Sequence, residues 1–373
     1  MPFKMRIAIL ELYCGQSGKS GYYNNQEIGL AKAYENMGHS VYVVLPNTQI
    51  KHPDIVPLTD NIKIVNVPAK VIGVHSFYQL SCLKTWRIDL VHIDSDNQIY
   101  ATHVMKYCLK NHIKFYNYVG AISSDSNKRI KNALSGFLSK ANIRMYRKTH
   151  TFVKTNTVQQ LLVQRGVKNA IVEPVGLDFE IIPPITESKE QLRKKLQLPM
   201  QQKLLLFVGR LEEYKRPIDA VLLLNIMNEK HTLVMVGDGT HKEQVMRKVD
   251  QFGLQKRFIY IKKLPNSKIH QYYKAADCFI NFNEKEIFGM SILEAIYQGC
   301  PVVARHAPGP DTIIQQGLTG YLCDSLKEMK NRINGMDIII SENIKAQMKE
   351  KFSWNNTAKS ILNQLDLLGN CNM

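Results

Sequence analysis

The chain has 373 residues, of which 45% are hydrophobic and 22% charged, and it carries a net charge of +17. This length exceeds what one hydrophobic core normally serves and predicts two domains, and the composition excludes a largely disordered chain. The positive charge favours anionic partners, namely phosphates, acidic lipid headgroups or nucleic acid, without choosing among them.

Targeting segments and cysteine frameworks are not evident in the sequence. No stretch is long and apolar enough for a transmembrane helix. Residues 1–13 begin with basic side chains, but the apolar run is short, contains Glu11 and leads into a glycine-rich turn, so we interpret it as a buried strand rather than a signal peptide. The seven cysteines contain no Cys-x-x-Cys pair, which argues against a zinc site and a disulfide framework. A reducing cytoplasm fits this pattern best.

Short β-prone runs alternate with longer segments that can form helices, and this alternation predicts parallel, doubly wound sheets. The predicted strands of the first half are residues 6–10, 40–45, 62–67, 90–93 and 113–118, with a predicted helix at 25–37. Those of the second half are residues 204–208, 232–236, 258–261, 278–281 and 301–304. The expected fold class is therefore α/β, with two Rossmann-like domains.

The two series are separated by residues 182–200, where a Pro183-Pro184 pair stops regular structure. We predict an N-terminal domain over residues 1–182 and a C-terminal domain over residues 183–352. The tail over residues 353–373 is predicted to form a final helix with Ser353 as its N-cap, packing across the domain junction.

A glycine-rich loop follows the first predicted strand. Gly15 and Gly18 would let backbone N–H groups approach an anion at the start of the helix that follows. The loop also contains Gly18-Lys19-Ser20, the end of a nucleoside-triphosphate phosphate loop, but Tyr13 stands where that motif requires glycine. A plain strand-to-helix turn is the alternative interpretation.

The segment 286–294, EIFGMSILE, is more specific. Glu286 would lie on a loop and Glu294 further along a helix, so that the two carboxylates accept hydrogen bonds from separate hydroxyls of one ligand. A surface helix with solvated acids is the alternative. The backbone at four consecutive positions would open the helix and face a diphosphate: Gly289, Met290, Ser291 and Ile292.

Glycines and cations follow two predicted strands at the edge where open α/β sheets bind ligands. Gly209, Arg210 and Lys215 follow the strand at 204–208, and Gly237 follows the next strand. Arg210 and Lys215 would neutralise a diphosphate leaving group. Taken singly, each cation is explained as well by a solvated surface charge.

The order of these motifs resembles that of the family 4 retaining glycosyltransferases, which have the GT-B fold. The resemblance rests on Gly209-Arg210 with Lys215, on Gly237-Asp238-Gly239, on residues 286–294 and on residues 308–320. It is strong over residues 204–322 and weaker in the amino-terminal half. It implies two Rossmann-like domains facing a central cleft, the first for the acceptor and the second for a nucleotide-sugar donor.

The resemblance also implies residue roles. Glu286 would contact the donor sugar, and Arg210 and Lys215 the diphosphate, which makes these three the expected catalytic residues. Glu294 would bind the ribose hydroxyls. The transfer would need neither a divalent metal nor another cofactor. The remaining donor-binding positions would be Gly15, Gly18, Gly209, Gly237, Gly289, Met290, Ser291 and Ile292.

The implied activity is retaining transfer of a hexose-type sugar, with a UDP-sugar favoured, to a glycan or lipid-linked acceptor in cell-surface polysaccharide or glycolipid assembly. Residues 127–148 carry seven basic and no acidic side chains, with apolar residues at helical spacing. If this segment docks on an anionic membrane, the enzyme would lie peripherally on the cytoplasmic face of that membrane. The alternative is a helix whose apolar side packs in the protein core. No RNP, KH or zinc signature supports nucleic-acid binding.

Three positions depart from the family pattern. Residues 115–120 offer no histidine where the family often has one at a strand end, Arg216 and Pro217 stand where glycine is common, and Asp311 replaces a glutamate. The missing histidine leaves open a non-catalytic partner subunit, and a sugar-nucleotide epimerase of the same fold is a further alternative.

Overall fold

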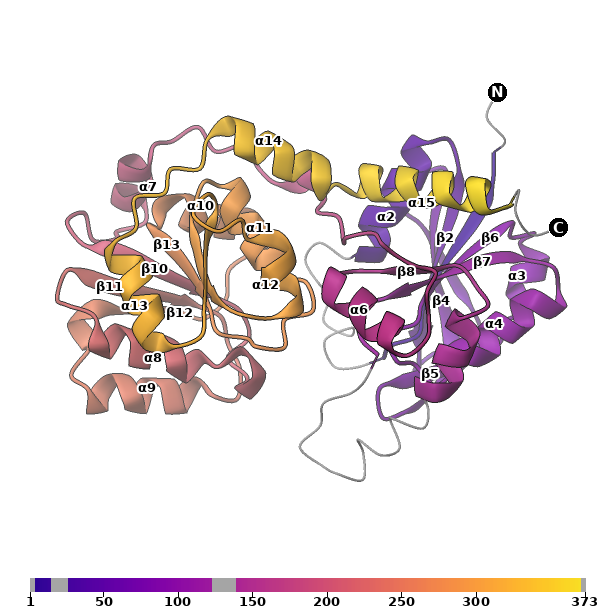
Figure 1. Ribbon diagram of the computed structural model, residues 1–373, viewed down its shortest axis with the longest axis horizontal. Coiled ribbons are helices and arrows are strands. Elements are labelled where there is room, and N and C mark those ends of the chain that lie inside the picture. Colours follow the sequence, from indigo (N-terminus) through magenta and orange to yellow (C-terminus); the bar gives the residue numbers. More distant parts are fainter. Residues whose placement is uncertain (1–3, 15–25, 123–138, 370–373) are drawn as a thin grey trace. The chain divides into compact units, whose positions relative to one another are not determined.

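The computed structural model describes residues 4–14, 26–122 and 139–369 (Figure 1). The chain divides into two compact units, the first formed by residues 1–178 and 352–373 and the second by residues 179–351. We had placed this division at 182/183. The earlier division follows from Phe179, whose ring packs against Tyr297 of the second unit with the ring centroids 4.7 Å apart.

The first unit contains a nine-stranded sheet with the order β3-β4-β2-β1-β6-β7-β8-β9, and β5 pairs with β4. Strands β3 and β5 run antiparallel to β4, and the other pairs are parallel. The winding reverses between β1 and β6, as in doubly wound folds. The strands are β1 (Arg6–Glu11), β2 (Ser40–Asn47), β3 (Asp54–Pro57), β4 (Ile62–Ile72), β5 (His75–Tyr78), β6 (Leu90–Asp94), β7 (Lys114–Val119), β8 (Thr151–Val153) and β9 (Ala170–Val172).

The second unit contains a six-stranded sheet, parallel throughout, with the order β12-β11-β10-β13-β14-β15. Every residue of β11 is buried, as expected of a central strand that is covered on both faces. The strands are β10 (Lys203–Val208), β11 (His231–Val236), β12 (Phe258–Ile261), β13 (Cys278–Asn281), β14 (Val302–Arg305) and β15 (Gly320–Cys323).

Helices connect the parallel strands. Those of the first unit are α2 (Gln26–Asn36), α3 (Cys82–Thr85), α4 (Ala101–Lys110), α6 (Asn156–Gln164) and α15 (Trp354–Gly369). Those of the second are α7 (Lys189–Lys195), α8 (Pro217–Ile226), α9 (Lys242–Gln251), α10 (Asn266–Ala275), α11 (Met290–Tyr297), α12 (Pro308–Ile313), α13 (Leu326–Asn334) and α14 (Glu342–Lys351), with the 3-10 helices η1 (Phe179–Ile181), η2 (Glu213–Lys215) and η3 (Gln255–Arg257). None of the helices in the described ranges is both long and apolar enough to cross a bilayer.

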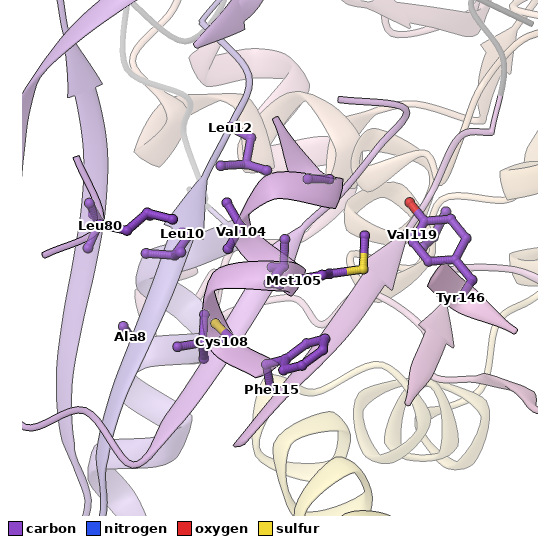
Figure 2. Packing of buried hydrophobic residues seen from close by; sticks show 14 of the residues in the cluster. Ala8, Leu10, Leu12, Leu80, Val104, Met105, Cys108, Phe115, Val119 and Tyr146 are labelled. Carbon is purple, nitrogen blue, oxygen red and sulfur yellow. The ribbon is translucent and has the colours of Figure 1, made fainter. Parts of the chain in front are cut away.

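Strand β1 shows how the first core forms. Residues 7–10 are all fully buried, although successive side chains of a strand point to opposite faces. Both faces of the sheet are therefore covered. Leu10 belongs to one core cluster with Met105 and Cys108 of α4 (Figure 2).

Helix α15 returns the chain to the first unit. Ser353 Oγ accepts a hydrogen bond from the Asn356 N–H at 3.2 Å, as expected of an N-cap. The Trp354 side chain lies against Gly29 of α2, where an added Cβ would come within 2.3 Å of the indole ring. Thr357 donates to the Pro174 carbonyl at 2.8 Å. These contacts tie α15 to the first unit, and its packing across the junction stays a prediction.

The predicted α/β fold class is confirmed, and all ten predicted strands are present. Their ends shift by a residue or two, except that β4 continues to Ile72. Strands β3, β5, β8, β9 and β15 were not predicted. Each has only three or four residues, so its hydrophobic pattern is a weak signal for a strand.

Replacing Gly29 by alanine tests the docking of Trp354 on α2. Such a change in a helix interior normally stabilises by about 1 kcal/mol. Here the opposite sign is expected, a loss of about 1–3 kcal/mol, because the new methyl group overlaps the indole. Urea unfolding of Gly29→Ala measures the change. Gly335→Ala is the matched control, since its Cβ would meet nothing closer than 3.6 Å. A Gly29→Ala protein more stable than the wild type would contradict the packing.

Candidate active site

The predicted donor residues gather at the carboxyl edge of the second sheet. Strands β11, β10 and β13 are parallel neighbours, so their carboxyl ends meet at one edge. Gly209 follows β10 and donates its N–H to the Val236 carbonyl at 3.0 Å. Gly237 follows β11, and a Cβ there would lie 1.8 Å from the Gly209 carbonyl oxygen. Gly237 requires glycine because the backbones approach so closely, whereas a Cβ at Gly209 would meet nothing nearer than 3.9 Å.

Lys215 and Glu286 form an ion pair between the segment after β10 and the loop after β13. Their side chains are only 19% and 14% exposed. Asn283 Nδ2 donates to the same carboxylate at 3.1 Å. Burial alone would raise the pKa of Glu286, but the Lys215 charge and the hydrogen bonds from Lys215 and Asn283 outweigh it, so the pKa lies below its usual value. Glu286 is therefore ionised at neutral pH.

Tyr214 lies between the two predicted diphosphate-binding cations. Arg210 Nη2 donates to the Tyr214 hydroxyl at 2.5 Å, and its guanidinium carbon lies 5.3 Å from the ring centroid. Lys215 Nζ lies 5.5 Å from the same centroid. Cations are attracted to an aromatic face at such distances. Tyr214 stands directly before Lys215 in the sequence but was not among the predicted site residues.

Helix α11 begins as the motif predicted. Gly289 is its N-cap, with φ of +99°, a conformation that favours glycine. The Ile292 N–H already donates to the Gly289 carbonyl at 2.9 Å. Of the predicted backbone donors, those of Met290 and Ser291 are consequently the better placed for a phosphate, because the first N–H groups of a helix have no partner within it.

Glu294 differs sharply from Glu286. It is 5% exposed and accepts a hydrogen bond from the Tyr273 hydroxyl of α10 at 3.1 Å. Burial raises its pKa to about 7, although the Tyr273 hydrogen bond opposes the shift. The two carboxylates of the motif therefore have different partners and opposite pKa shifts.

Other sequence predictions are only partly covered by the structure. Gly15 and Gly18 lie outside the described residues, as do residues 127–138 of the basic segment. The described remainder forms a helix over 139–146, in which Ile143 and Tyr146 are buried and Ala141 is exposed. Ala141 is one of the apolar residues at helical spacing in 127–148, and its exposure contradicts a place on a buried apolar face. The four described basic residues are all exposed: Lys140, Arg144, Arg147 and Lys148.

Two residues that depart from the family pattern, Arg216 and Asp311, contact side chains of opposite charge or a histidine. Arg216 has φ of +52°, a conformation that favours glycine, and it pairs with Asp219 at 2.7 Å and with Glu284 at 2.6 Å. Asp311 pairs with His306 at 2.9 Å. Asn283 and Tyr273 donate hydrogen bonds to the two glutamates and were not predicted, because they belong to no motif.

Comparison with known proteins shows a likeness to one family. Residues 188–358, less than half of the chain, match the family model described as glycosyl transferases group 1. The chain is a glycosyltransferase and is similar to this group. It is 22% identical to D-inositol 3-phosphate glycosyltransferase of Corynebacterium urealyticum, covering 96% of this chain and 94% of that protein. It is 26% identical to α-monoglucosyldiacylglycerol synthase of Streptococcus pneumoniae, covering 65% of this chain and 57% of that protein.

Solved structures agree on the fold of the glycosyltransferase. Sucrose-phosphate synthase of Thermosynechococcus elongatus superposes with a TM-score of 0.77 at 16% identity, covering 99% of this chain and all of that one. HepE of Anabaena in complex with UDP and glucose gives a TM-score of 0.71 at 19% identity, covering 97% and 99% of the two chains. The predicted GT-B fold is thereby confirmed. The assignment to retaining family 4 and the residue roles stay predictions.

The two glutamates should respond differently to pH. A carboxyl whose pKa is raised by folding binds more protons when folded, so stability falls as pH rises from about 4.5 to about 7. For Glu294 the loss over this range is about 3 kcal/mol. The Glu294→Gln protein should lack this loss when denaturant unfolding is followed against pH. Glu286→Gln should change the profile in the opposite sense, because the pKa of Glu286 is lowered. Equal profiles for wild type and Glu294→Gln would refute the assignment.

Proposed function

We propose that this glycosyltransferase moves a hexose-type sugar from a nucleotide-diphosphate sugar to a glycan or lipid-linked acceptor, with retention of anomeric configuration. The observation that carries the proposal is the buried Lys215–Glu286 pair at the carboxyl edge of the second sheet. It joins a cation suited to a diphosphate with a carboxylate suited to sugar hydroxyls. Helix α11, whose first N–H groups can bind a phosphate, begins shortly after Glu286 in the sequence.

The chemistry follows from where charge develops. As the bond from the anomeric carbon to the leaving phosphate breaks, negative charge grows on the diphosphate. Arg210 and Lys215 stabilise that charge, and the N–H groups at the start of α11 add to it. Glu286 orients the sugar through its hydroxyls, and the leaving phosphate takes the proton of the acceptor hydroxyl. No metal or other cofactor enters this scheme.

Tyr214 contributes by holding Arg210 and Lys215 on one aromatic ring before the donor arrives. Two cations this close repel each other, and the ring face offsets part of that repulsion. The diphosphate then meets a charged surface that is already arranged, and preorganised charge is the form that lowers a barrier most.

Relatives and neighbours support a UDP-sugar and a lipid-linked or glycan acceptor. HepE was solved with UDP and glucose, and also with UDP-glucose. One relative is named for the synthesis of a glucosyl-diacylglycerol lipid. Four exposed basic residues over 139–148 and the net charge of +17 suit a peripheral position at an anionic, cytoplasmic membrane face, where surface-polysaccharide or glycolipid assembly takes place.

A screen of nucleotide sugars tests the donor. Purified protein with a chelator is incubated with UDP-, GDP-, ADP- and dTDP-sugars, and melting and hydrolysis are measured. The true donor should stabilise the native protein by about 3 kcal/mol at a hundredfold excess over Kd. Glu294→Ala should lose this gain, whereas Glu243→Ala on the exposed side of α9 should keep it. If none of these sugars shifts the melting temperature, the donor proposal fails.

Removal of a single cation tests the catalytic role. Lys215→Ala should lower kcat about 100- to 1000-fold, because one stabilising group for the developing charge is lost. Lys215→Arg should recover part of the rate. Lys327→Ala, which removes an exposed lysine of α13, should leave the rate unchanged. Transfer by Lys215→Ala at the wild-type rate would rule out the assigned role.

A further inference from the structure

A second group of charged residues lies at the carboxyl edge of the first sheet. Glu11 ends β1 and Asp94 ends β6, and the parallel register makes these two residues direct neighbours. Glu27, in the first turn of α2, completes the group. One carboxylate oxygen from each of the three lies within 4.8 Å of the other two. The winding of the sheet reverses between β1 and β6, where open α/β sheets bind ligands.

The charge of this group is not balanced by the side chains around it. Lys154 Nζ lies 3.3 Å from Asp94 and 3.0 Å from Asp96, so its single charge is shared with a fourth carboxylate. Over the described ranges, no cationic side chain forms an ion pair with Glu11 or Glu27. Carboxylates this close repel one another, and a bound cation would remove the repulsion.

A small hollow lies beside the carboxylates. Its walls include Glu27, Asp94, His92 and Trp354, and it has room for about one water molecule or ion, too little for a sugar ring. Trp354 is 4% exposed, and its indole N–H finds no hydrogen-bond acceptor in the described part of the chain. A buried N–H without an acceptor is unfavourable. An oxygen atom next to the carboxylates would accept the missing hydrogen bond from the Trp354 N–H.

We propose that Glu11, Glu27 and Asp94 bind one hard divalent cation, of the size of Ca²⁺. Such ions prefer carboxylate oxygens, and ligands on opposite sides of Ca²⁺ stand about 5 Å apart, against about 4 Å for Mg²⁺. Oxygens that lie within 4.8 Å of one another can all contact one Ca²⁺ ion. The ion lies among the three carboxylates, and a water molecule of its shell, held in the hollow, supplies the oxygen that the Trp354 N–H lacks.

This site lies wholly within the first unit and takes no part in the donor chemistry proposed above. Lys154 keeps its contact with Asp96, whose other oxygen accepts the Ala121 N–H at 3.2 Å. The cation joins the ends of β1 and β6 to the start of α2. Its expected effect is a Ca²⁺-dependent gain in the melting temperature of the full chain in the absence of any nucleotide sugar.

Terbium luminescence tests the site at residue level. Tb³⁺ occupies Ca²⁺ sites and emits when a nearby indole is excited, and the chain has two tryptophans, Trp86 and Trp354. The full-length protein, freed of metal by chelation and dialysis, should show indole-excited Tb³⁺ emission that Ca²⁺ displaces. Trp354→Phe should abolish the emission, and Trp86→Phe should retain it.

Calorimetric titration with Ca²⁺ alone supplies the second measurement. Glu27→Gln and Asp94→Asn should each raise Kd about 10- to 100-fold or more, since loss of a residue that merely orients a metal ligand already has an effect of that size. Glu243→Gln in the second unit is the matched control and should bind as the wild type does. Circular dichroism verifies that each variant folds. Absence of Ca²⁺ binding by the wild type, or equal binding by Glu27→Gln and Glu243→Gln, overturns the proposal.

The outcome is separable from that of the donor screen, which contains chelator throughout. A chain that binds Ca²⁺ but no nucleotide sugar would retain this site and refute the proposed donor. A chain that binds a nucleotide sugar but no Ca²⁺ would leave the glycosyltransferase scheme unchanged and refute the cation site. Retention of Tb³⁺ emission in Trp354→Phe would also count against the site, because the ion would then lie elsewhere.

Discussion

Parallel strand register is the constraint on which both sites depend, because it brings the carboxyl ends of neighbouring strands to one edge. Lys215 and Glu286 are 71 residues apart in sequence, yet they meet because β10 and β13 are neighbours. Glu11 and Asp94 meet in the same way at the ends of β1 and β6. The inner strands of the sheets are buried on both faces, so the edge is where charged side chains can gather without entering the core.

The two edges differ in how charge is balanced. In the second unit Lys215 and Asn283 satisfy Glu286, which stays ionised despite its burial. Glu294, in the same motif, is buried with one tyrosine hydroxyl as its hydrogen-bond donor, and burial raises its pKa to about 7. Hydroxyl groups of a ligand would stabilise its ionised form, so the donor binding proposed for Glu294 would be coupled to release of a proton.

Sequence reasoning predicted the long strands and the motif positions because both are local patterns. Periodicity identifies a buried strand such as β1, and glycine spacing identifies the start of α11. The partners of those motifs could not be predicted in this way. Tyr273 contacts Glu294 through the packing of α10 on α11, and Glu11 becomes a neighbour of Asp94 only once the strand order is known.

Arg216 shows how a departure from the family pattern is accommodated. Its left-handed backbone is unfavourable by about 1–2 kcal/mol for a residue other than glycine, but its guanidinium binds Glu284 at 2.6 Å. Glu284 is held in turn by Arg305 of β14 at 2.7 Å. The segment bearing Lys215 and the loop bearing Glu286 are therefore joined twice, once by the Lys215–Glu286 pair and once through Arg216. Because the second connection survives loss of the Lys215 charge, the rate of Lys215→Ala reports on that charge rather than on collapse of the loop.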